Sequence, residues 1–225
     1  MKKLLVVSCT QVRENNKKAL KIYQSLEPMK AEVKLKIHFE NTTGLPEVYN
    51  QYITPQTLAK HDVVLFAHDD LYVDDFKLRG KLLSAMDAFD IVGLAGCLQP
   101  AIKKPALWHL MSSRENWRGY VAHPLQDASN RIAMTSFGPT PSRVAIIDGL
   151  FIAVNLSRAL EANWKFNTDY NFHHYDIASC LDANEKHLKV GVAPINTIHN
   201  SPGLTNYDDE SYQQSEQKFL DSYGS

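Results

Sequence analysis

The sequence predicts an α/β protein with a mostly parallel central sheet, helices on both faces of that sheet, and an irregular second half. Short apolar runs alternate with helical patterns from residue 2 to about residue 96. Strands that alternate with helices usually pair in parallel, because the chain crosses a face of the sheet between neighbouring strands. Residues 97–142 instead hold two of the tryptophans and much of the proline.

The first three elements are predicted from one continuous apolar run and two periodic patterns. Residues 2–10 form a continuous apolar run, which is typical of a buried strand. Residues 15–26 place apolar side chains at helical spacing between lysines, and residues 33–39 alternate strictly between apolar and polar. We therefore expect a strand, a helix and a second strand.

The next part of the chain repeats the alternation. Residues 42–53 read as a loop that enters a helix, with Pro46 near its first turn. The unbroken apolar run Val63–Ala67 predicts a buried strand, and a helix is expected from about Asp75 to Phe89. Residues 90–96 then predict another strand.

The second half contains a predicted hairpin and a broken strand. Residues 118–123 and 131–137 are strand-like runs separated by a longer polar loop. Residues 142–160 read as a strand pair or bent strand, broken at Asp148-Gly149, that leads into a short helix.

The last elements are a helix, a strand and a polar C-terminal helix. We expect the helix over residues 172–187, the strand over 188–195, and the final helix from Asp208 onward, with Tyr212 and Phe219 on its apolar face. Neither a repeat nor a clear linker interrupts the chain. The prediction is one domain over residues 1–225, with a first half of residues 1–96 and a second half of residues 97–225.

Composition limits the class of protein. The chain has 225 residues, 44% of them hydrophobic, and a formal net charge of -1. These values are typical of a globular protein and give no support for binding to nucleic acid. No run approaches the ~18 apolar residues of a membrane span, and the apolar run Leu4–Val7 is too short for a signal peptide.

Three widely spaced cysteines, Cys9, Cys97 and Cys180, do not form a C-x-x-C pair. An odd number of separated cysteines favours free thiols in a reducing cytoplasm over a disulfide framework or a zinc site. We therefore expect a cytoplasmic location.

The buried strand Val63–Ala67 ends in a dense group of acidic residues. His68, Asp69 and Asp70 follow it directly, at the strand end where open α/β sheets bind ligands. An adjacent carboxylate pair supplies oxygen ligands to Mg²⁺ or Mn²⁺, or it forms a solvated turn. Asp74 and Asp75 precede the next helix and are interpreted as caps of its N-terminus.

Two further positions carry groups with possible chemistry. Asp176 stands near a predicted helix start, where a carboxylate serves either as a cap or as a general base. His199 follows the strand of residues 188–195, where a histidine is either an ordinary loop residue or a metal ligand.

Six stretches, taken in their order along the chain, resemble the GT-A fold glycosyltransferases. They are LLVVSCT, GLPEVYNQYI, VVLFAHDDLYV, VAIIDGLFIAVN, FHHYDIASCL and VGVAPINTIHNS. The resemblance covers residues 3–202 and is to the family-2-like branch that includes the StrF-type domain. It implies transfer of a sugar from a nucleoside diphosphate sugar to an acceptor hydroxyl in polysaccharide or glycoconjugate biosynthesis. The first half would bind the nucleotide and the second half the acceptor.

The resemblance implies a metal site that contains Mn²⁺ or Mg²⁺. Asp70 matches the metal-binding member of a D-x-D-type motif, and His199 matches a histidine that completes the metal shell in some relatives. Asp69 would lie next to the ribose or diphosphate. His68 replaces the first carboxylate of the motif and is assigned to the nucleotide-sugar site.

The resemblance also implies the catalytic residue. Asp176 matches the base of similar inverting enzymes, while Tyr175 replaces the glutamate of the usual Glu-Asp pair. Asp148 falls where an acceptor-side loop would meet the sugar, or it is a turn aspartate before a glycine.

The remaining expected contacts fall into two groups. Base and ribose contacts are assigned to polar residues of the first half, namely Thr10, Gln11, Arg13, Asn41 and Asn50. Trp108 and Trp117 either stack on the acceptor sugar or pack in the core or a lid.

The expected partners are a nucleotide-sugar donor and a glycan, lipid-linked or small-molecule acceptor, with peripheral membrane contact left open. Two alternatives remain. The first is a non-catalytic domain of this fold that binds nucleotide or glycan, which the His68 and Tyr175 departures favour. The second is a nucleotidyltransferase, although the end of the first strand lacks the usual glycine-rich phosphate loop.

Overall fold

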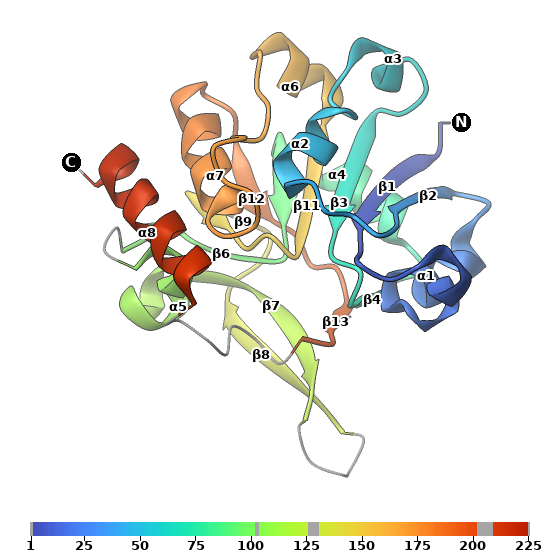
Figure 1. The fold of residues 1–225 in the computed structure, drawn as a ribbon, viewed down its shortest axis with the longest axis horizontal. Coiled ribbons are helices and arrows are strands. Elements are labelled where there is room, and N and C mark those ends of the chain that lie inside the picture. The colour runs from blue at the N-terminus through green and yellow to red at the C-terminus, as the bar shows by residue number, and fades with distance from the viewer. Residues whose placement is uncertain (1, 102–103, 126–130, 202–208, 225) are drawn as a thin grey trace.

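The structure, a computed structural model, describes the chain except residues 1, 102–103, 126–130, 202–208 and 225. Two sheets form its frame, and a hairpin of strands β7 and β8 extends away from the rest (Figure 1). The α/β fold class is confirmed. The division of the chain into a nucleotide half and an acceptor half remains a prediction.

The larger sheet has seven strands in the order β2-β1-β3-β11-β5-β12-β9. Strand β1 is parallel to β2 and β3, whereas β11 is antiparallel to both of its neighbours, β3 and β5, and β12 is parallel to β5. Only β11 and β9 therefore oppose the common direction, so the mostly parallel sheet is as predicted. The bounds are β1 Leu4–Cys9, β2 Val33–His38, β3 Val63–Ala67, β5 Ile91–Gly93, β9 Ser142–Arg143, β11 Phe151–Asn155 and β12 Val190–Val192.

The smaller sheet has the order β10-β6-β7-β13-β4, with β8 paired to β7. Its strands are antiparallel except for the pair β13 and β7. The bounds are β4 Leu71–Val73, β6 Ala95–Cys97, β7 Trp117–Pro124, β8 Ile132–Gly138, β10 Ile146–Ile147 and β13 Thr197–His199.

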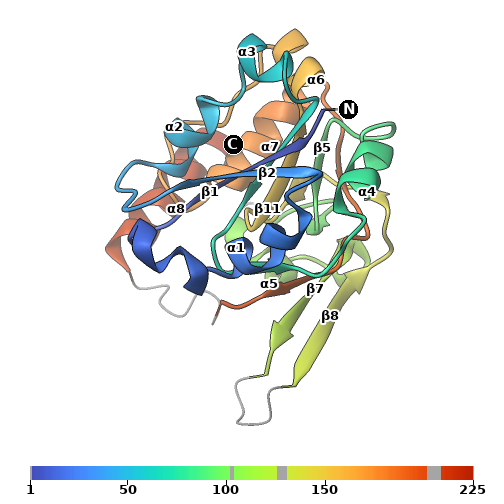
Figure 2. The same ribbon diagram turned by 90° about the vertical axis from the view of Figure 1, so that its right-hand side faces the viewer.

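Helices cover both faces of the larger sheet. Figure 2 looks at the edge formed by β2 and shows α2 and α4 on opposite sides of the strands. The α-helices are α1 Lys21–Leu26, α2 Leu45–Asn50, α3 Pro55–Leu58, α4 Leu78–Ala85, α5 Trp108–Met111, α6 Leu156–Glu161, α7 Tyr175–Glu185 and α8 Glu210–Tyr223. The 3-10 helices are η1 Glu14–Ala19, η2 Glu27–Met29, η3 Pro105–Leu107 and η4 Arg114–Asn116.

Two predicted helices differ from the observed ones. The helix expected over residues 15–26 is η1 followed by α1, because Leu20 between them is extended with a ψ of 130°. The helix expected from Asp75 begins only at Leu78, and its N-cap is Lys77 rather than an aspartate. Asp75 stabilises the preceding turn instead, where its carboxylate accepts a hydrogen bond from the Lys77 backbone N–H and pairs with Lys81.

Two features of the strands were not predicted. Residues 90–96 form β5 and β6, which belong to different sheets, because the chain turns at Leu94 between them. Strand β4, directly after the acidic group, pairs with β13 near the end of the chain. The loop expected between β7 and β8 lies largely outside the described residues.

The core fills the space around the larger sheet. All five residues of β3 are buried, as an uninterrupted apolar strand between two layers of helices requires. The three cysteines are free, as predicted. Among the described residues, no helix is both long and apolar enough to cross a lipid bilayer.

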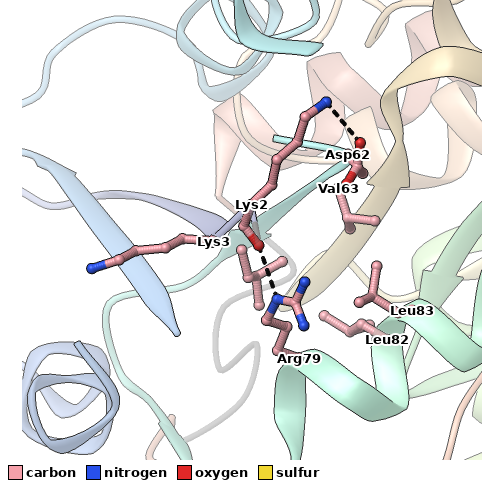
Figure 3. Close-up of a pocket in the computed structure, with 8 residues that line it drawn as sticks. Lys2, Lys3, Asp62, Val63, Arg79, Leu82 and Leu83 are labelled. Atoms are coloured by element: carbon pink, nitrogen blue, oxygen red, sulfur yellow. Dashed lines mark hydrogen bonds and ion pairs between the residues drawn. The ribbon is translucent and has the colours of Figure 1, made fainter. Parts of the chain in front are cut away.

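Polar contacts fix the edge of the sheet where β1 and β3 begin (Figure 3). The Lys2 ammonium lies 2.9 Å from Asp62 Oδ1 and also donates a hydrogen bond to the Leu58 carbonyl. Arg79 Nε of α4 donates a hydrogen bond to the Lys2 carbonyl. The side chains of this ion pair are largely exposed to solvent, so it positions the strands more than it stabilises them.

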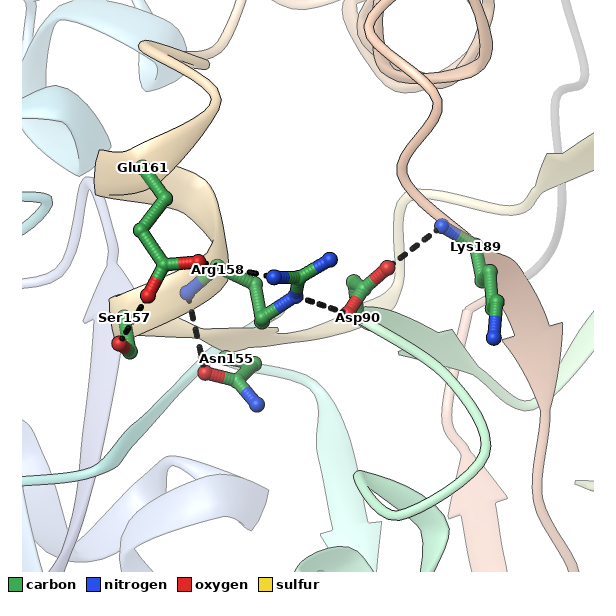
Figure 4. A network of polar contacts seen from close by, with 6 residues as sticks. All are labelled: Asp90, Asn155, Ser157, Arg158, Glu161 and Lys189. Carbon is green, nitrogen blue, oxygen red and sulfur yellow. Dashed lines mark hydrogen bonds and ion pairs between the residues drawn. The ribbon is translucent and has the colours of Figure 1, made fainter.

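A second polar network joins β5, α6 and β12 at the same edge (Figure 4). Asp90 is 8% exposed, and its carboxylate accepts hydrogen bonds from the Lys189 backbone N–H at 2.8 Å and from Arg158 Nε at 3.2 Å. Arg158 also contacts Glu161. Because Asp90 satisfies a backbone donor at the start of β12, its loss leaves that donor without a partner.

The substitution Asp90→Ala should lower the free energy of unfolding by about 1–2 kcal/mol, because the part-buried hydrogen bonds from the Lys189 N–H and from Arg158 are lost. Urea denaturation monitored by circular dichroism measures this change. Asp87→Ala is the matched control, since Asp87 is exposed and close in the chain. Equal stability of the two variants would contradict the structural role of Asp90.

Candidate functional site

Two hollows lie at the carboxyl edge of the larger sheet and share part of their walls. The first, called here the groove, has a volume of about 850 Å³, and the second, called the cavity, about 650 Å³. Cys9, Leu45, Asp69 and Phe172 line both of them. A ligand that fills the groove therefore reaches the cavity at Asp69.

The groove is formed mainly by two short parts of the chain. They are the residues that follow β1 and the loop that enters α2. The hydroxyl of Thr10 accepts a hydrogen bond from the Val12 backbone N–H, and Asn41 donates to the Thr43 carbonyl. The lining comprises Cys9, Thr10, Gln11, Val12, Asn41, Thr42, Thr43, Gly44, Leu45, Glu47, Asp69, Asn171 and Phe172.

The cavity is formed by residues from many elements. Carboxylates and histidines share its walls with the aromatic side chains of Trp108 and Phe137. Trp108 is 2% exposed, so most of its ring packs in the core and only a small part borders the cavity.

Three possible metal ligands gather where the groove meets the cavity. One ligand atom each from His68, Asp70 and His199 lies within 4.8 Å of the others. His68 directly follows β3, and Asp69 and Asp70 form a turn in which the Leu71 backbone N–H donates to the His68 carbonyl at 3.4 Å. The turn brings Asp70 to His68 and His199, while Asp69 lines both the groove and the cavity.

The ladder between β4 and β13 brings His199 to this position. In that ladder His199 lies opposite Leu71, the residue after Asp70. Asn200 donates two hydrogen bonds to the Asp70 carbonyl, from its backbone N–H and from its side chain, each at 3.1 Å. The backbone thus fixes the separation of two ligands that are far apart in the chain.

The candidate ligand atoms have no hydrogen-bond partners among the described residues. His68 Nε2, Asp70 Oδ1 and His199 Nε2 are buried and unsatisfied. The distance from His199 Nε2 to Asp70 Oδ1 is 3.4 Å, which is long for a hydrogen bond. Burial of unsatisfied polar atoms is costly, and a cation among them removes that cost. The residues therefore fit a divalent metal, and two imidazoles with one carboxylate suit Mn²⁺ better than Mg²⁺.

The charges of this group influence one another. Burial lowers the pKa of His68. Burial acts to raise the pKa of Asp70, but the contact with His199 and the charges of His199 and His68 outweigh it and hold that pKa below its ordinary value. Burial acts to lower the pKa of His199, but Asp70 and then Asp148 outweigh it and raise that pKa.

A pair of carboxylates, Asp148 and Asp176, lies on the cavity side of the metal-ligand group. Asp148 follows β10, and its Oδ1 accepts a hydrogen bond from the Leu150 backbone N–H at 3.2 Å. Asp176 is in the first turn of α7, and its Oδ1 accepts from the Ile177 backbone N–H at 2.9 Å. Tyr175 Oη donates to the Gly149 carbonyl at 3.0 Å and so holds the turn against the helix.

The environment of Asp176 favours its protonated form. Burial, followed by the negative charge of Asp148, raises the pKa of Asp176 to about 7. Backbone N–H groups of Ile177 and Gly149 act in the opposite direction. A carboxyl with a pKa near neutrality is suited to accept a proton from a substrate and release it again.

The structure brings most of the predicted site residues together. Thr10, Gln11 and Asn41 line the groove, and Trp108, Asp148 and Asp176 line the cavity with His68, Asp70 and His199. Their roles stay predictions.

Three residues that were predicted to contact the substrates line neither the groove nor the cavity. Asn50 uses its side chain to donate to the Phe166 carbonyl and to accept from the Phe166 backbone N–H, so it joins α2 to a distant loop. Arg13 is exposed and pairs with Glu40 at 3.4 Å. Trp117 donates from Nε1 to the Ser112 hydroxyl, which favours the packing interpretation for this residue.

Sequence reasoning missed some residues of the site. His68 belongs to the group of possible metal ligands, whereas the prediction assigned it to the nucleotide-sugar site. Phe172 is 57% exposed, and its ring stacks on that of His68 at a centroid distance of 6.2 Å, where groove and cavity meet. His174 is 2% exposed and lines the cavity.

Solved structures with the same fold are glycosyltransferases, although their sequences are distant. S. aureus TarS shares 12% identity with a TM-score of 0.52, over 98% of this chain and 39% of that one. The catalytic domain of Drosophila beta1,4galactosyltransferase 7, solved with xylobiose, shares 10% identity with a TM-score of 0.53, over 92% and 73%. GalNAc-T7, solved with UDP, GalNAc and Mn²⁺, shares 8% identity with a TM-score of 0.56, over 98% and 48%.

At these identities the structures establish the fold alone, and this chain spans less than half the length of TarS and GalNAc-T7. A comparison with curated proteins gives no match. The fold is that of the GT-A glycosyltransferases. A family model described as "Glycosyltransferase like family" matches residues 5–223, nearly the whole chain, and the protein belongs to that family.

The substitution Gly149→Ala should slow sugar transfer by up to about 100-fold, the effect of misplacing a catalytic group by about 1 Å, because it displaces Asp176, the predicted base. A Cβ at Gly149 would lie 2.8 Å from Tyr175 Oη and 3.1 Å from Asp176 Oδ2, so both side chains must move. Gly80→Ala is the control, since nothing lies within 4 Å of its added Cβ. The measurement is the transfer rate of both variants with the same donor. A normal rate for Gly149→Ala would contradict the close approach of Tyr175 and Asp176 to Gly149.

Proposed function

We propose that the protein transfers a sugar from a nucleoside diphosphate sugar to an acceptor hydroxyl, with inversion and with a divalent metal at His68, Asp70 and His199. The observation that carries this proposal is the meeting of groove and cavity at Asp69, beside the metal-ligand group. The reaction belongs to polysaccharide or glycoconjugate biosynthesis.

The groove holds the nucleotide in this proposal. Thr10, Gln11 and Asn41 offer polar groups for the base and ribose, and Asp69 lies where the ribose or diphosphate enters the cavity. GalNAc-T7, which has the same fold, was solved with UDP and Mn²⁺, which supports a nucleotide of this type. The calorimetry described below identifies the base of the donor nucleotide.

The metal site stabilises the leaving group. When bound, Mn²⁺ or Mg²⁺ offsets the negative charge that develops on the departing diphosphate, an effect of several kcal/mol. His68, Asp70 and His199 would hold the ion through two imidazole nitrogens and a carboxylate oxygen. The unpartnered state of these three atoms is the property of this chain that supports metal dependence.

Asp176 accepts the proton of the acceptor hydroxyl. As that hydroxyl oxygen bonds to the anomeric carbon, the bond from this carbon to the diphosphate oxygen breaks. The proton passes to the Asp176 carboxylate. One displacement of this kind inverts the configuration at the anomeric carbon.

The substitution Asp70→Asn should weaken metal-dependent nucleotide binding by about 100-fold or more, because an anionic ligand of the metal is lost. Isothermal titration calorimetry with UDP, GDP and dTDP, each with Mn²⁺ or Mg²⁺, measures this effect and identifies the base. Asp74→Asn is the matched control, because Asp74 is exposed and outside the group. Unchanged affinity in Asp70→Asn would remove Asp70 from the metal site.

The substitution Asp176→Asn should leave donor binding intact and reduce transfer by about 10²–10⁴-fold, the usual contribution of a general base. Glu185→Gln, an exposed position on the same helix, should retain full activity. If Asp176→Asn turns over normally, another group accepts the proton. If the wild-type protein binds nucleotide but shows no measurable sugar transfer, the result would instead favour a non-catalytic binding domain.

Activity should also depend on pH in a defined direction. The pKa of Asp176 is raised to about 7, so the residue is protonated below that pH and cannot act as a base. We expect kcat/KM to rise with pH through a midpoint near 7, because kcat/KM reports groups of the free enzyme. A rate profile that is flat from pH 5 to pH 9 would exclude Asp176 as the base.

A further inference from the structure

The cavity presents acceptors of hydrogen bonds and negative charge to its ligand. Its lining contains four carboxylates, those of Asp69, Asp70, Asp148 and Asp176. Among the described residues that line it, there is no lysine or arginine. Burial lowers the pKa of His109 and of His173, which favours the neutral form of both imidazoles.

The two carboxylates on the acceptor side keep capacity for further hydrogen bonds. Among the described residues, Asp148 accepts from the backbone N–H of Leu150, and Asp176 accepts from the backbone N–H groups of Ile177 and Gly149. Neither carboxylate has an ion-pair partner in the described part of the chain. A ligand that carries hydroxyl groups satisfies both.

His174 is an independent observation in the same cavity. It is 2% exposed, its ring packs against Tyr212 and Phe219 of α8, and its backbone is left-handed with a φ of 63°. Its Nε2 is buried and has no hydrogen-bond partner among the described residues. A buried unsatisfied nitrogen in the wall of a cavity indicates a missing partner.

The hydrogen-bond network determines what that partner must be. Ser215 Oγ donates its single proton to the His173 carbonyl at 2.9 Å, because a carbonyl oxygen only accepts. His174 Nδ1, which lies 2.9 Å from the same Oγ, must therefore carry a proton and donate it. In the neutral imidazole the other nitrogen, Nε2, is then a pure acceptor, and burial lowers the pKa of His174 to about 4, which keeps the ring neutral.

We propose that the cavity binds an unphosphorylated sugar as the acceptor, one hydroxyl of which donates a hydrogen bond to Nε2 of His174. This inference rests on the proposed sugar transfer and names the class of its acceptor. Sugar hydroxyls donate to His174, Asp148 and Asp176, whereas a phosphate offers only acceptors and negative charge at neutral pH. Asp148 and Asp176, with no lysine or arginine in the described lining, disfavour such an anion on the acceptor side of the cavity.

The size and apolar parts of the cavity agree with a sugar. Its volume of about 650 Å³ falls within the range of ~300–1,000 Å³ of small-molecule sites. The aromatic side chains of Trp108 and Phe137 form an apolar part of the wall. A sugar ring, with apolar C–H faces and donor hydroxyls at its rim, matches both kinds of surface.

Saturation-transfer NMR on the full-length protein with UDP and Mn²⁺ tests the acceptor class. The probes are methyl β-D-glucopyranoside, methyl β-D-galactopyranoside, methyl β-D-xylopyranoside and N-acetylglucosamine, with glucose 6-phosphate as the anionic counterpart. We expect saturation transfer to at least one neutral sugar and none to glucose 6-phosphate. The inference is overturned if glucose 6-phosphate binds as well as the neutral sugars do. It is also overturned if none of the neutral sugars binds.

The variant His174→Asn tests the role of the nitrogen. Asparagine tolerates the left-handed backbone and can donate to Ser215, but its side chain is too short to replace Nε2. The control is His187→Asn, because His187 is also left-handed, with a φ of 60°, and is exposed just beyond the other end of the same helix. We expect about tenfold weaker sugar binding in His174→Asn, unchanged binding in His187→Asn, and equal melting temperatures.

Nucleotide binding measured in the same samples separates the two levels of the proposal. If His174→Asn binds the neutral sugar as the wild type does, the assigned contact is wrong. If the wild type binds nucleotide and Mn²⁺ but no neutral sugar, the acceptor class is wrong while sugar transfer still stands. If it binds sugar but no nucleotide with any metal, the proposed transfer is wrong and the sugar site remains.

Discussion

The short antiparallel ladder between β4 and β13 is the constraint on which the candidate site depends. It spans three residues in each strand and joins segments separated by about 130 positions in the chain. The ladder places His199 beside Asp70, and the two hydrogen bonds from Asn200 fix the turn that carries Asp70. If these strands slipped by one residue, the His199 side chain would point to the opposite face of the sheet.

The antiparallel direction of β11 is the second constraint. Because β11 runs against β3 and β5, its start lies at the same edge of the sheet as the end of β3. The turn of Asp148 and Gly149 therefore comes next to His68, whose backbone N–H donates to the Leu150 carbonyl at 3.1 Å. Helix α7 completes the arrangement through the hydrogen bond from Tyr175 to Gly149.

The sequence predicts the parts of this site whose signals are local. The apolar run of β3 predicts where Asp69 and Asp70 emerge, and the break before Gly149 predicts the turn that carries Asp148. Contacts between distant segments have no local signal. Asn50 looks like a free polar residue at the end of a helix, but its partner is the backbone of Phe166, 116 positions away. The division of residues 90–96 between two sheets likewise follows from tertiary pairing.

The two hollows differ in how the chain builds them. Two neighbouring segments, around residues 9–12 and 41–47, supply most of the groove, whereas the cavity draws on residues from Cys9 to Tyr212. Exchanging positions that line the groove alone, such as Gln11 and Thr42, therefore alters one hollow with little disturbance of the other. During divergence of such proteins, the preference for one partner can change through local substitutions, while the preference for the other requires concerted changes across the whole domain.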